Sequence, residues 1–271
     1  MIYCIYVFKG SGFMIEGYAI WKVAIICVGV FIASFIDAIG GGGGIISLPS
    51  YLIVGIPTHF SLGTNKLSSF LGTTASAFRF IKSGYVDWVL AIPSIILAVI
   101  GGFCGTSLQL MISETYLKYL LIVVLIAVAI FMLKKKEFPE EAGDISPVKQ
   151  RIIIWIAAFI LGMYDGFYGP GSSTFMLLVF CRLGKMDVRT ASGNIRLVTL
   201  SSNFGALVTS LVAGKVLIVI GLISAAFAFV GHYLGAGVMI KNGTKIVTPV
   251  IFIVLGLLLT KIVLELCGVW V

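Results

Sequence analysis

Long apolar stretches separated by short polar ones recur along the whole sequence, and they restrict the fold more than any other feature. The runs 116–133, 216–240 and 246–266 each approach the roughly 20 apolar residues that a transmembrane helix needs. A membrane β-barrel would instead show segments of about ten residues with alternating hydrophobicity. The chain is 59% hydrophobic and only 11% charged, whereas soluble domains are about 25% charged. We therefore predict an all-α polytopic membrane protein whose main partner is the lipid bilayer.

Several other classes of segment and site are not indicated. Residues 1–8 are apolar but lack a basic leader and a small-residue cleavage site, so no cleaved signal peptide is predicted. The five cysteines are scattered without a CxxC spacing, and the two histidines are isolated. We therefore predict neither a metal site nor a cofactor.

Ten apolar elements can be placed along the chain, and two of them have only about ten residues. The first five cover 18–39, 45–54, 60–80, 88–112 and 116–133, and the last five cover 152–167, 174–183, 188–212, 216–240 and 246–266. Between these two sets, residues 134–150 carry charges of both signs and two prolines, which is typical of a solvated linker. We predict a first membrane repeat (1–133), a cytoplasmic linker (134–150) and a second membrane repeat (151–271).

The basic residues predict the orientation of the chain in the membrane. When the loops are assigned alternately to two sides, four Lys residues fall on one side and twelve Lys or Arg residues on the other. Those twelve are Arg79, Lys82, Lys134, Lys135, Lys136, Lys149, Arg151, Arg182, Lys185, Arg189, Lys241 and Lys245. Positive loops remain in the cytoplasm, so both termini are predicted to lie outside the cytoplasmic membrane. The net charge of +8 follows from this topology, and no nucleic-acid partner is implied.

The two halves of the sequence resemble each other. Asp37 matches Asp165 at an offset of 128, Asn65 matches Asn194 at 129, and GGFCG (101–105) matches GHYLG (231–235) at 130. Five elements per half reverse the side from which the second copy enters the membrane. We therefore predict an inverted-topology repeat, with about eight full transmembrane helices plus broken-helix hairpins, or with ten spans. Many secondary transporters have this architecture, with the substrate at the repeat interface.

Two glycine-rich segments interrupt the apolar sequence at equivalent places in the halves. Each lies before one of the ten-residue elements, and irregular backbone is tolerated in a bilayer only where it is buried in protein or lines a wet cavity. We predict that each segment is the turn of a hairpin that reaches towards the midplane and offers backbone amides to an anion. The alternative is that the glycines only allow close helix packing. The predicted substrate-binding residues here are Gly41, Gly42, Gly43, Gly44, Gly169, Pro170, Gly171 and Ser172.

Asp37 and Asp165 are acids inside the predicted spans. A charged carboxylate at this depth is costly, so it normally faces a polar path or a partner. One hypothesis is that these acids couple transport to a proton or another cation. The alternative is structural, with each carboxylate accepting hydrogen bonds from the backbone of its own hairpin.

The helices that follow the two hairpins carry amides, hydroxyls and one cation each. Asn65 is followed by Lys66, and Asn194 lies two residues before Arg196. Arg196 is about eight residues, or roughly 12 Å, into its helix. Lys66 is shallower, and an alternative is that it extends to the membrane interface. Two cations beside two glycine turns favour a small anion as the substrate.

Three segments together resemble a known family: FIDAIGGGGGIISLPS, TNKLSSFLGTTASAFRF and YDGFYGPGSSTFM. They are similar to the TauE/SafE family of sulfite and organosulfonate exporters, in particular its YfcA-like subgroup. The resemblance implies a bacterial cytoplasmic-membrane protein that moves small sulfur-containing anions at the two glycine-rich hairpins. It places family positions on Gly41–Gly44, Pro49, Thr64, Asn65, Lys66, Asp165, Gly166, Gly169, Pro170, Gly171 and Asn194. The sequence departs from the family pattern at Ser172–Thr174 and at Gly193, which leaves the identity of the substrate open.

The leading hypothesis is a secondary transporter of a small anion, a sulfur oxyanion or an organosulfonate, that works by alternating access. One alternative is an anion channel. A second is an intramembrane enzyme that uses Asp37 and Asp165 as a carboxylate dyad, but Asp37 precedes its glycines instead of following them. We predict no catalytic residues, and the sequence does not indicate an oligomeric state.

Overall fold

A computed structural model describes residues 14–113, 116, 141–243, 245–246 and 249–250. All but a few residues of the predicted spans 116–133 and 246–266, and residues 134–140 of the linker, lie outside the described residues. The helices are α1 (Ile20–Gly40), α2 (Gly44–Ile53), α3 (Thr58–Lys82), α4 (Trp88–Leu110), α6 (Pro147–Phe167), α7 (Ser172–Leu178), the π-helix η1 (Val179–Leu183), α8 (Val188–Val212) and α9 (Ile218–Asn242). A two-stranded hairpin, β1 (Met14–Ile15) and β2 (Tyr18–Ala19), precedes α1.

The prediction of an all-α polytopic membrane protein is confirmed. Within the described residues, five helices are long and apolar enough to cross a membrane: α1, α4, α6, α8 and α9. α3 is equally long, with 25 residues, but it carries more polar side chains. α6 begins at Pro147, so the last four residues of the predicted linker are helical. Proline suits this first position because the missing N–H would have no helical partner there.

Aspartates begin two of the long helices. The Asp87 carboxylate accepts hydrogen bonds from the first backbone amides of α4, and the Asp187 carboxylate does the same for α8, at 2.9–3.3 Å. These side chains satisfy amides that a helix start leaves without partners. They set where α4 and α8 begin after short connections.

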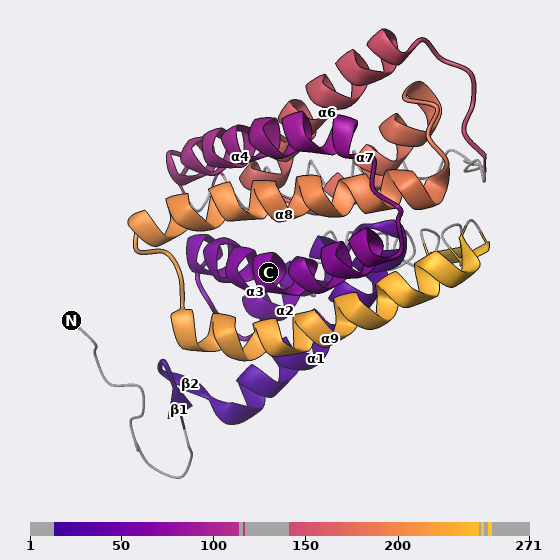
Figure 1. The fold of residues 1–271 in the computed structure, drawn as a ribbon. Coiled ribbons are helices and arrows are strands. Elements are labelled where there is room, and N and C mark those ends of the chain that lie inside the picture. The colour runs from indigo at the N-terminus through magenta and orange to yellow at the C-terminus, as the bar shows by residue number, and fades with distance from the viewer. Residues whose placement is uncertain (1–13, 114–115, 117–140, 244, 247–248, 251–271) are drawn as a thin grey trace.

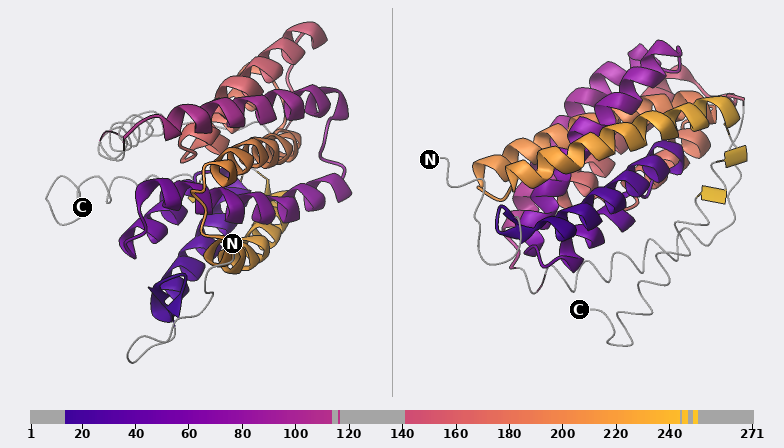
Figure 2. Two further views of the ribbon diagram at one scale, coloured as in Figure 1. Left: turned by 90° about the vertical axis from the view of Figure 1, so that its left-hand side faces the viewer. Right: turned by 90° about the horizontal axis from the view of Figure 1, so that it is seen from below.

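The long helices form a row in the order α6, α4, α8, α3, α9 and α1 (Figure 1). Neighbours in this row are the helix pairs with the most extensive contacts, and the views in Figure 2 show α1 alongside α9 at one end. The order is symmetrical about the α3–α8 contact if α6, α8 and α4 are the counterparts of α1, α3 and α9. A duplicated unit with a two-fold relation would give these pairings; the inverted orientation in a membrane stays a prediction.

Two close approaches on either side of the α3–α8 contact are also equivalent. The Cα of Gly63 in α3 lies against the carbonyl of Lys215, and the Cα of Gly193 in α8 lies against the carbonyl of Tyr85. Both pairs are related by an offset of 130 residues. At that offset Lys66 is the counterpart of Arg196. The predicted match of Asn65 with Asn194 at 129 is therefore one residue out of register in the structure.

The π-helix accounts for the change in the residue offset between the two halves, which is 128 at Asp37 and Asp165 and 130 in the helices that follow. The acids match at 128, and the short helices α2 and α7 both begin at that offset, at Gly44 and Ser172. α2 has 10 residues, whereas α7 with η1 has 12, Ser172–Leu183. A π-helix is wider than an α-helix and takes up inserted residues without ending the helix. The two additional residues of the second half are thus contained in this one element.

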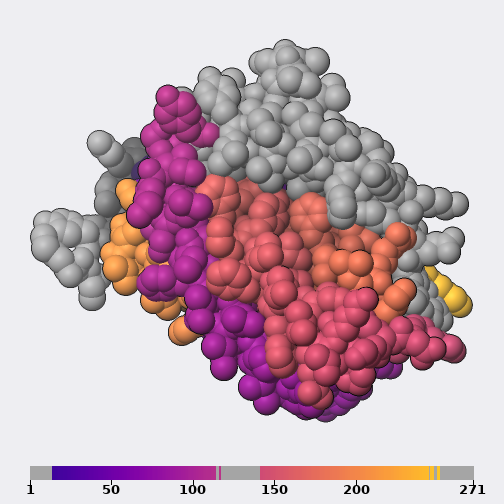
Figure 3. Space-filling view, turned by 90° about the horizontal axis from the view of Figure 1, so that it is seen from above, coloured from indigo at the N-terminus to yellow at the C-terminus, as the bar shows by residue number. Residues whose placement is uncertain are grey.

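Apolar stripes cover the outer surface of the row. Ile92, Ile96 and Ile100 recur every four residues on α4, and α6 has a matching isoleucine stripe at 152, 156 and 160; all are 47–59% exposed. Figure 3 shows these two helices side by side on one face of the molecule. A soluble protein rarely exposes apolar surface this continuous, so this face is suited to lipid.

We expect Gly193→Ala to lower stability by about 1–3 kcal/mol, as overpacking of a tight contact does. The added methyl group would collide with the backbone carbonyl of Tyr85, which cannot rotate away as a side chain could. Gly162→Ala is the matched control, since its added carbon would lie 3.1 Å from the Ala98 Cα and needs only a small adjustment. Thermal unfolding of the purified protein in detergent measures both. Equal melting temperatures for Gly193→Ala and the wild type would contradict the close packing.

Candidate functional site

The two glycine-rich turns meet in the interior of the protein. The hydroxyl of Thr174, just after the second turn, donates to the carbonyl of Gly40 at 3.0 Å. A side chain on Gly41 would collide with the Thr174 backbone, and one on Gly44 would lie 3.0 Å from the Cα of Pro170. The turns are therefore packed against each other without room for larger residues.

Glycine is also required by the backbone conformation of the turns. Gly41 and Gly42 have φ values of 80° and 87°, and Gly169 and Gly171 have values of 98° and 82°. Residues other than glycine rarely adopt this left-handed backbone conformation. The close contact and the backbone conformation together explain why both turns are glycine-rich.

A small polar cavity lies beside the meeting point of the turns. Its volume is about 50 Å³, which is room for a few water molecules or one small polyatomic ion. The lining side chains come from α1, α2, α3, α6, α7, α8 and α9, so both halves of the chain contribute. The lining residues are Val30, Ala33, Ser34, Asp37, Gly43, Gly44, Ser47, Asn65, Lys66, Ser69, Thr73, Asp165, Gly169, Ser172, Ser173, Thr199, Asn203 and His232.

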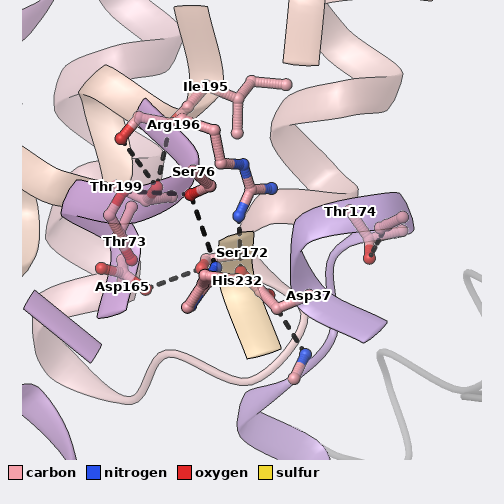
Figure 4. Close-up of polar contacts among 12 residues, drawn as sticks. Asp37, Thr73, Ser76, Asp165, Ser172, Thr174, Ile195, Arg196, Thr199 and His232 are labelled. Carbon is pink, nitrogen blue, oxygen red and sulfur yellow. Dashed lines mark hydrogen bonds and ion pairs between the residues drawn. The ribbon is translucent and has the colours of Figure 1, made fainter. Parts of the chain in front are cut away.

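The first of two buried ion pairs joins Asp37 of α1 to Arg196 of α8 (Figure 4). The Arg196 Nη1 donates to Asp37 Oδ2 at 2.6 Å, and the backbone N–H of Gly43 donates to Asp37 Oδ1 at 3.1 Å. The Arg196 side chain is only 4% exposed, and its Nε has no hydrogen-bond partner among the described residues.

The second ion pair joins Lys66 of α3 to Asp165 of α6. The Lys66 Nζ lies 3.4 Å from Asp165 Oδ2 and also donates to the backbone carbonyl of Asp165. The Asp165 carboxylate accepts hydrogen bonds from the hydroxyls of Ser172 at 2.7 Å and Ser202 at 2.5 Å. Both charged side chains are at most 7% exposed. Lys66 therefore points into the protein, and the alternative that it extends to the membrane interface is wrong.

The two ion pairs are equivalent under the offsets that relate the halves. In each pair the acid lies in the last turn of the first helix of one half, and the cation lies in the third helix of the other half. The pairs thus cross between the halves. Each carboxylate is paired with a cation, and this arrangement differs from the shared-proton dyad of an aspartyl protease.

The structure brings many of the predicted site residues to the cavity wall but leaves others behind it. Those on the wall are Asp37, Gly43, Gly44, Asn65, Lys66, Asp165, Gly169 and Ser172. Those that do not line it are Gly41, Gly42, Thr64, Pro170, Gly171, Asn194 and Arg196. Thr64 instead accepts a hydrogen bond from the Leu217 amide at the start of α9, at 3.0 Å, and Asn194 donates to the Thr190 carbonyl at 2.9 Å. The assignment of all these residues to a substrate site stays a prediction.

Several residues of the cavity wall were not predicted. His232 in α9 is 3% exposed, lines the cavity and lies 3.5 Å from the hydroxyl of Ser76 through its Nδ1. Thr199 and Asn203 of α8 are also on the wall. At the offset of 130 they match Ser69 and Thr73 on α3. A search at that offset would have found these two, whereas the counterpart of His232 is Gly102, which gives no signal.

Comparison with models of protein families identifies the family of this chain. The family model described as sulfite exporter TauE/SafE matches residues 25–262. The chain belongs to the sulfite exporter TauE/SafE family. The resemblance predicted from the glycine-rich segments is therefore confirmed.

Curated relatives in bacteria share most of the length of this chain. A "probable membrane transporter protein ORF9" from Sinorhizobium is 33% identical over 86% of this chain and 88% of its own length. A "probable membrane transporter protein" from Haemophilus influenzae is 30% identical over 88% and 93%. The "probable membrane transporter protein YfcA" of Escherichia coli is 27% identical over 88% of both chains. No solved structure matches significantly. This family member is a multi-pass membrane transporter and not an enzyme.

We expect Arg196→Ala to cost about 3 kcal/mol, at the lower end of the range for a broken buried pair, because it leaves the Asp37 carboxylate, which is 20% exposed, without its cation. The double variant Asp37→Ala/Arg196→Ala should lose clearly less than the sum of the two single variants. Thermal unfolding in detergent measures this double-mutant cycle, with the exposed Lys241→Ala as a control for loss of a positive charge. Additive losses would show that the pair contributes no coupling energy.

Proposed function

We propose that this protein is a secondary transporter of a small anion and that the substrate binds in the cavity beside the two glycine turns. The observation that carries the proposal is the position of Lys66, a buried ammonium group on the wall of this cavity. A buried ionisable side chain at membrane depth is expensive, so a functional role is the default hypothesis for it.

The remaining polar groups of the wall suit an oxyanion. Ser34, Ser47, Ser69, Thr73 and Ser173 place hydroxyl donors around the cavity. The Asn65 side chain is also on the wall, and its carboxamide oxygen has no partner among the described residues. A rotation of that amide would offer two more donors. Sulfonate and sulfite groups have three oxygens that accept such bonds, and the family's description names sulfite export.

The meeting of the hairpins supports alternating access as the transport mechanism. Each half supplies one glycine hairpin and one acid to the cavity wall, so a tilt of one half against the other would expose the site to one side at a time. Arg79 at the end of α3 donates to the Tyr233 carbonyl of α9, and Arg189 at the start of α8 donates to the Ile240 carbonyl. These cationic helix ends lie together, and we infer that they face the cytoplasm, with both termini outside.

We expect Lys66→Gln to weaken anion binding at least tenfold, since truncating a buried charged contact typically costs about 2–5 kcal/mol. Lys82→Gln is the matched control, because it removes an exposed lysine from the same helix. Thermal stabilisation of the purified protein measures binding of methanesulfonate, sulfite, thiosulfate, sulfoacetate and acetate.

Equal stabilisation of the Lys66→Gln protein and the wild type by the same anions would reject the cavity as the substrate site. Stabilisation by none of the anions in the wild type would reject the anion assignment. Flux into proteoliposomes separates the mechanisms: a transporter saturates with substrate and exchanges label between its two sides, while flux that rises linearly would indicate a channel.

A further inference from the structure

The two equivalent acids of the site have different hydrogen-bond partners. We propose that Lys66 and Asp165 form a charge-exchange pair, in which a singly charged anion replaces Asp165 at the ammonium group while Asp165 takes up one proton. Asp37 with Arg196 is the fixed pair that ties the two halves together. This inference rests on the proposed anion site and names the charge of its substrate and the group that couples it.

Among the described residues, both hydrogen-bond partners of the Asp37 carboxylate are donors. Its Oδ2 accepts from the Arg196 guanidinium and its Oδ1 from the Gly43 amide. Neither group has a lone pair that could accept a hydrogen bond, and the guanidinium does not lose its proton in proteins. A proton on Asp37 would therefore face donors and leave the arginine buried without a counter-charge.

Asp165 is held by groups that can both donate and accept. The hydroxyls of Ser172 and Ser202 donate to the carboxylate, and each can rotate to accept a hydrogen bond from the protonated acid. Ser202 has a second acceptor in place, since its Oγ is 3.1 Å from the carbonyl of Thr199. When Asp165 is protonated, Ser202 can donate to Thr199 and accept from the acid. Both protonation states of Asp165 are then hydrogen-bonded.

The difference comes from two substitutions between the repeats. The counterparts of Ser172 and Ser202 in the first half are Gly44 and Gly72, which have no hydroxyl to offer Asp37. The space above Gly72 is taken by His232, whose counterpart is Gly102. The site is thus symmetrical in its charges and asymmetrical in the groups that could accommodate a proton.

The ion pair between the Lys66 ammonium group and the Asp165 carboxylate is also the longer of the two, and Lys66 is held in addition by its hydrogen bond to the Asp165 backbone carbonyl. Its Nζ–Oδ2 distance of 3.4 Å exceeds the usual 2.7–2.9 Å of a charged hydrogen bond, whereas Arg196 and Asp37 are 2.6 Å apart. Lys66 lines the cavity and Arg196 does not. An anion in the cavity can therefore reach Lys66 without displacing the arginine.

Other titratable groups surround Asp165, and none of them supplies a second cation to the cavity wall. Tyr164 precedes it on α6, Asp37 and Arg196 neutralise each other, and His232 of α9 lines the same cavity. From α4 the neighbour is Thr106, whose hydroxyl donates to the Gly166 carbonyl at 2.7 Å. Among the described wall residues, Lys66 is thus the single lysine or arginine.

The charges of the site limit the substrate to one negative charge. Before binding, each carboxylate is balanced by one cation. A bound monoanion is balanced if one proton moves from water to a carboxylate oxygen of Asp165, and the pair Lys66–anion then replaces Lys66–Asp165. A dianion would leave one buried charge without compensation, which is strongly unfavourable. Sulfonates with a single charge and hydrogen sulfite fit this requirement, and sulfate does not.

The test is the pH dependence of methanesulfonate binding, because this probe keeps one negative charge over the range used. We expect the wild-type Kd to rise tenfold for each unit of increasing pH, as uptake of one proton by the ionised carboxylate requires. Asp165→Asn should bind with a Kd that does not change with pH. Asp37→Asn is the matched control and should keep the tenfold slope although its melting temperature falls.

A second measurement does not depend on any variant. Methanesulfonate and a proton moving together carry no net charge, so flux in proteoliposomes should not respond to an imposed membrane potential. Ethane-1,2-disulfonate, with two charges, should bind at least tenfold more weakly. Loss of the slope in Asp37→Asn but not in Asp165→Asn, a pH-independent wild-type Kd, or flux driven by the potential would each overturn the exchange pair. Binding of methanesulfonate with any of these results would leave the anion site standing, whereas no anion binding at all would overturn both.

Discussion

Two buried ion pairs that cross between the halves are the interaction on which the interior of this transporter depends. Asp37 and Lys66 from the first half and Asp165 and Arg196 from the second are each costly at this depth without a partner. Because each acid meets the cation of the other half, neither half satisfies its charges alone. The two halves must therefore associate in one register, and the glycine turns allow the backbones to come close enough for this to happen.

Most of the fold could be predicted from the hydropathy pattern of the sequence. Helix α8 begins and ends where the apolar pattern places it, at Val188 and Val212, because lipid imposes the same requirement on every span. The short element after Pro170 ends at Leu183 as predicted but begins at Ser172, two residues earlier than predicted. Its π-helix was not predicted, because residues inserted in a helix change the hydrogen bonding without changing the hydropathy. The start of α6 was placed too late, because Pro147 is a helix breaker in a span but a favourable first residue.

The site was predictable in its residue types and less so in its geometry. The depth of the two acids and the glycine runs pointed to the turns, and the cations pointed to an anion. The pairing of cation with acid across the halves was not visible, because matching identical asparagines placed α3 and α8 one residue out of register. His232 could not be found from the repeat, since it stands where the other half has glycine. Contacts that differ between the two halves depend on packing between segments that are distant in the sequence. The repeat pattern holds no information about that packing.

The asymmetry has a consequence for motion. The two ion pairs are among the contacts that join the halves, and we infer that a tilt of one half against the other breaks at least one of these pairs. An anion on Lys66 with a proton on Asp165 would remove the side-chain ion pair between these residues and leave the shorter Asp37–Arg196 contact as the proposed pivot. A free carboxylate would instead hold Lys66 and keep the halves together. Substrate and proton would thereby release the same contact, so that neither alone permits the tilt, which is the condition that a coupled transporter must meet.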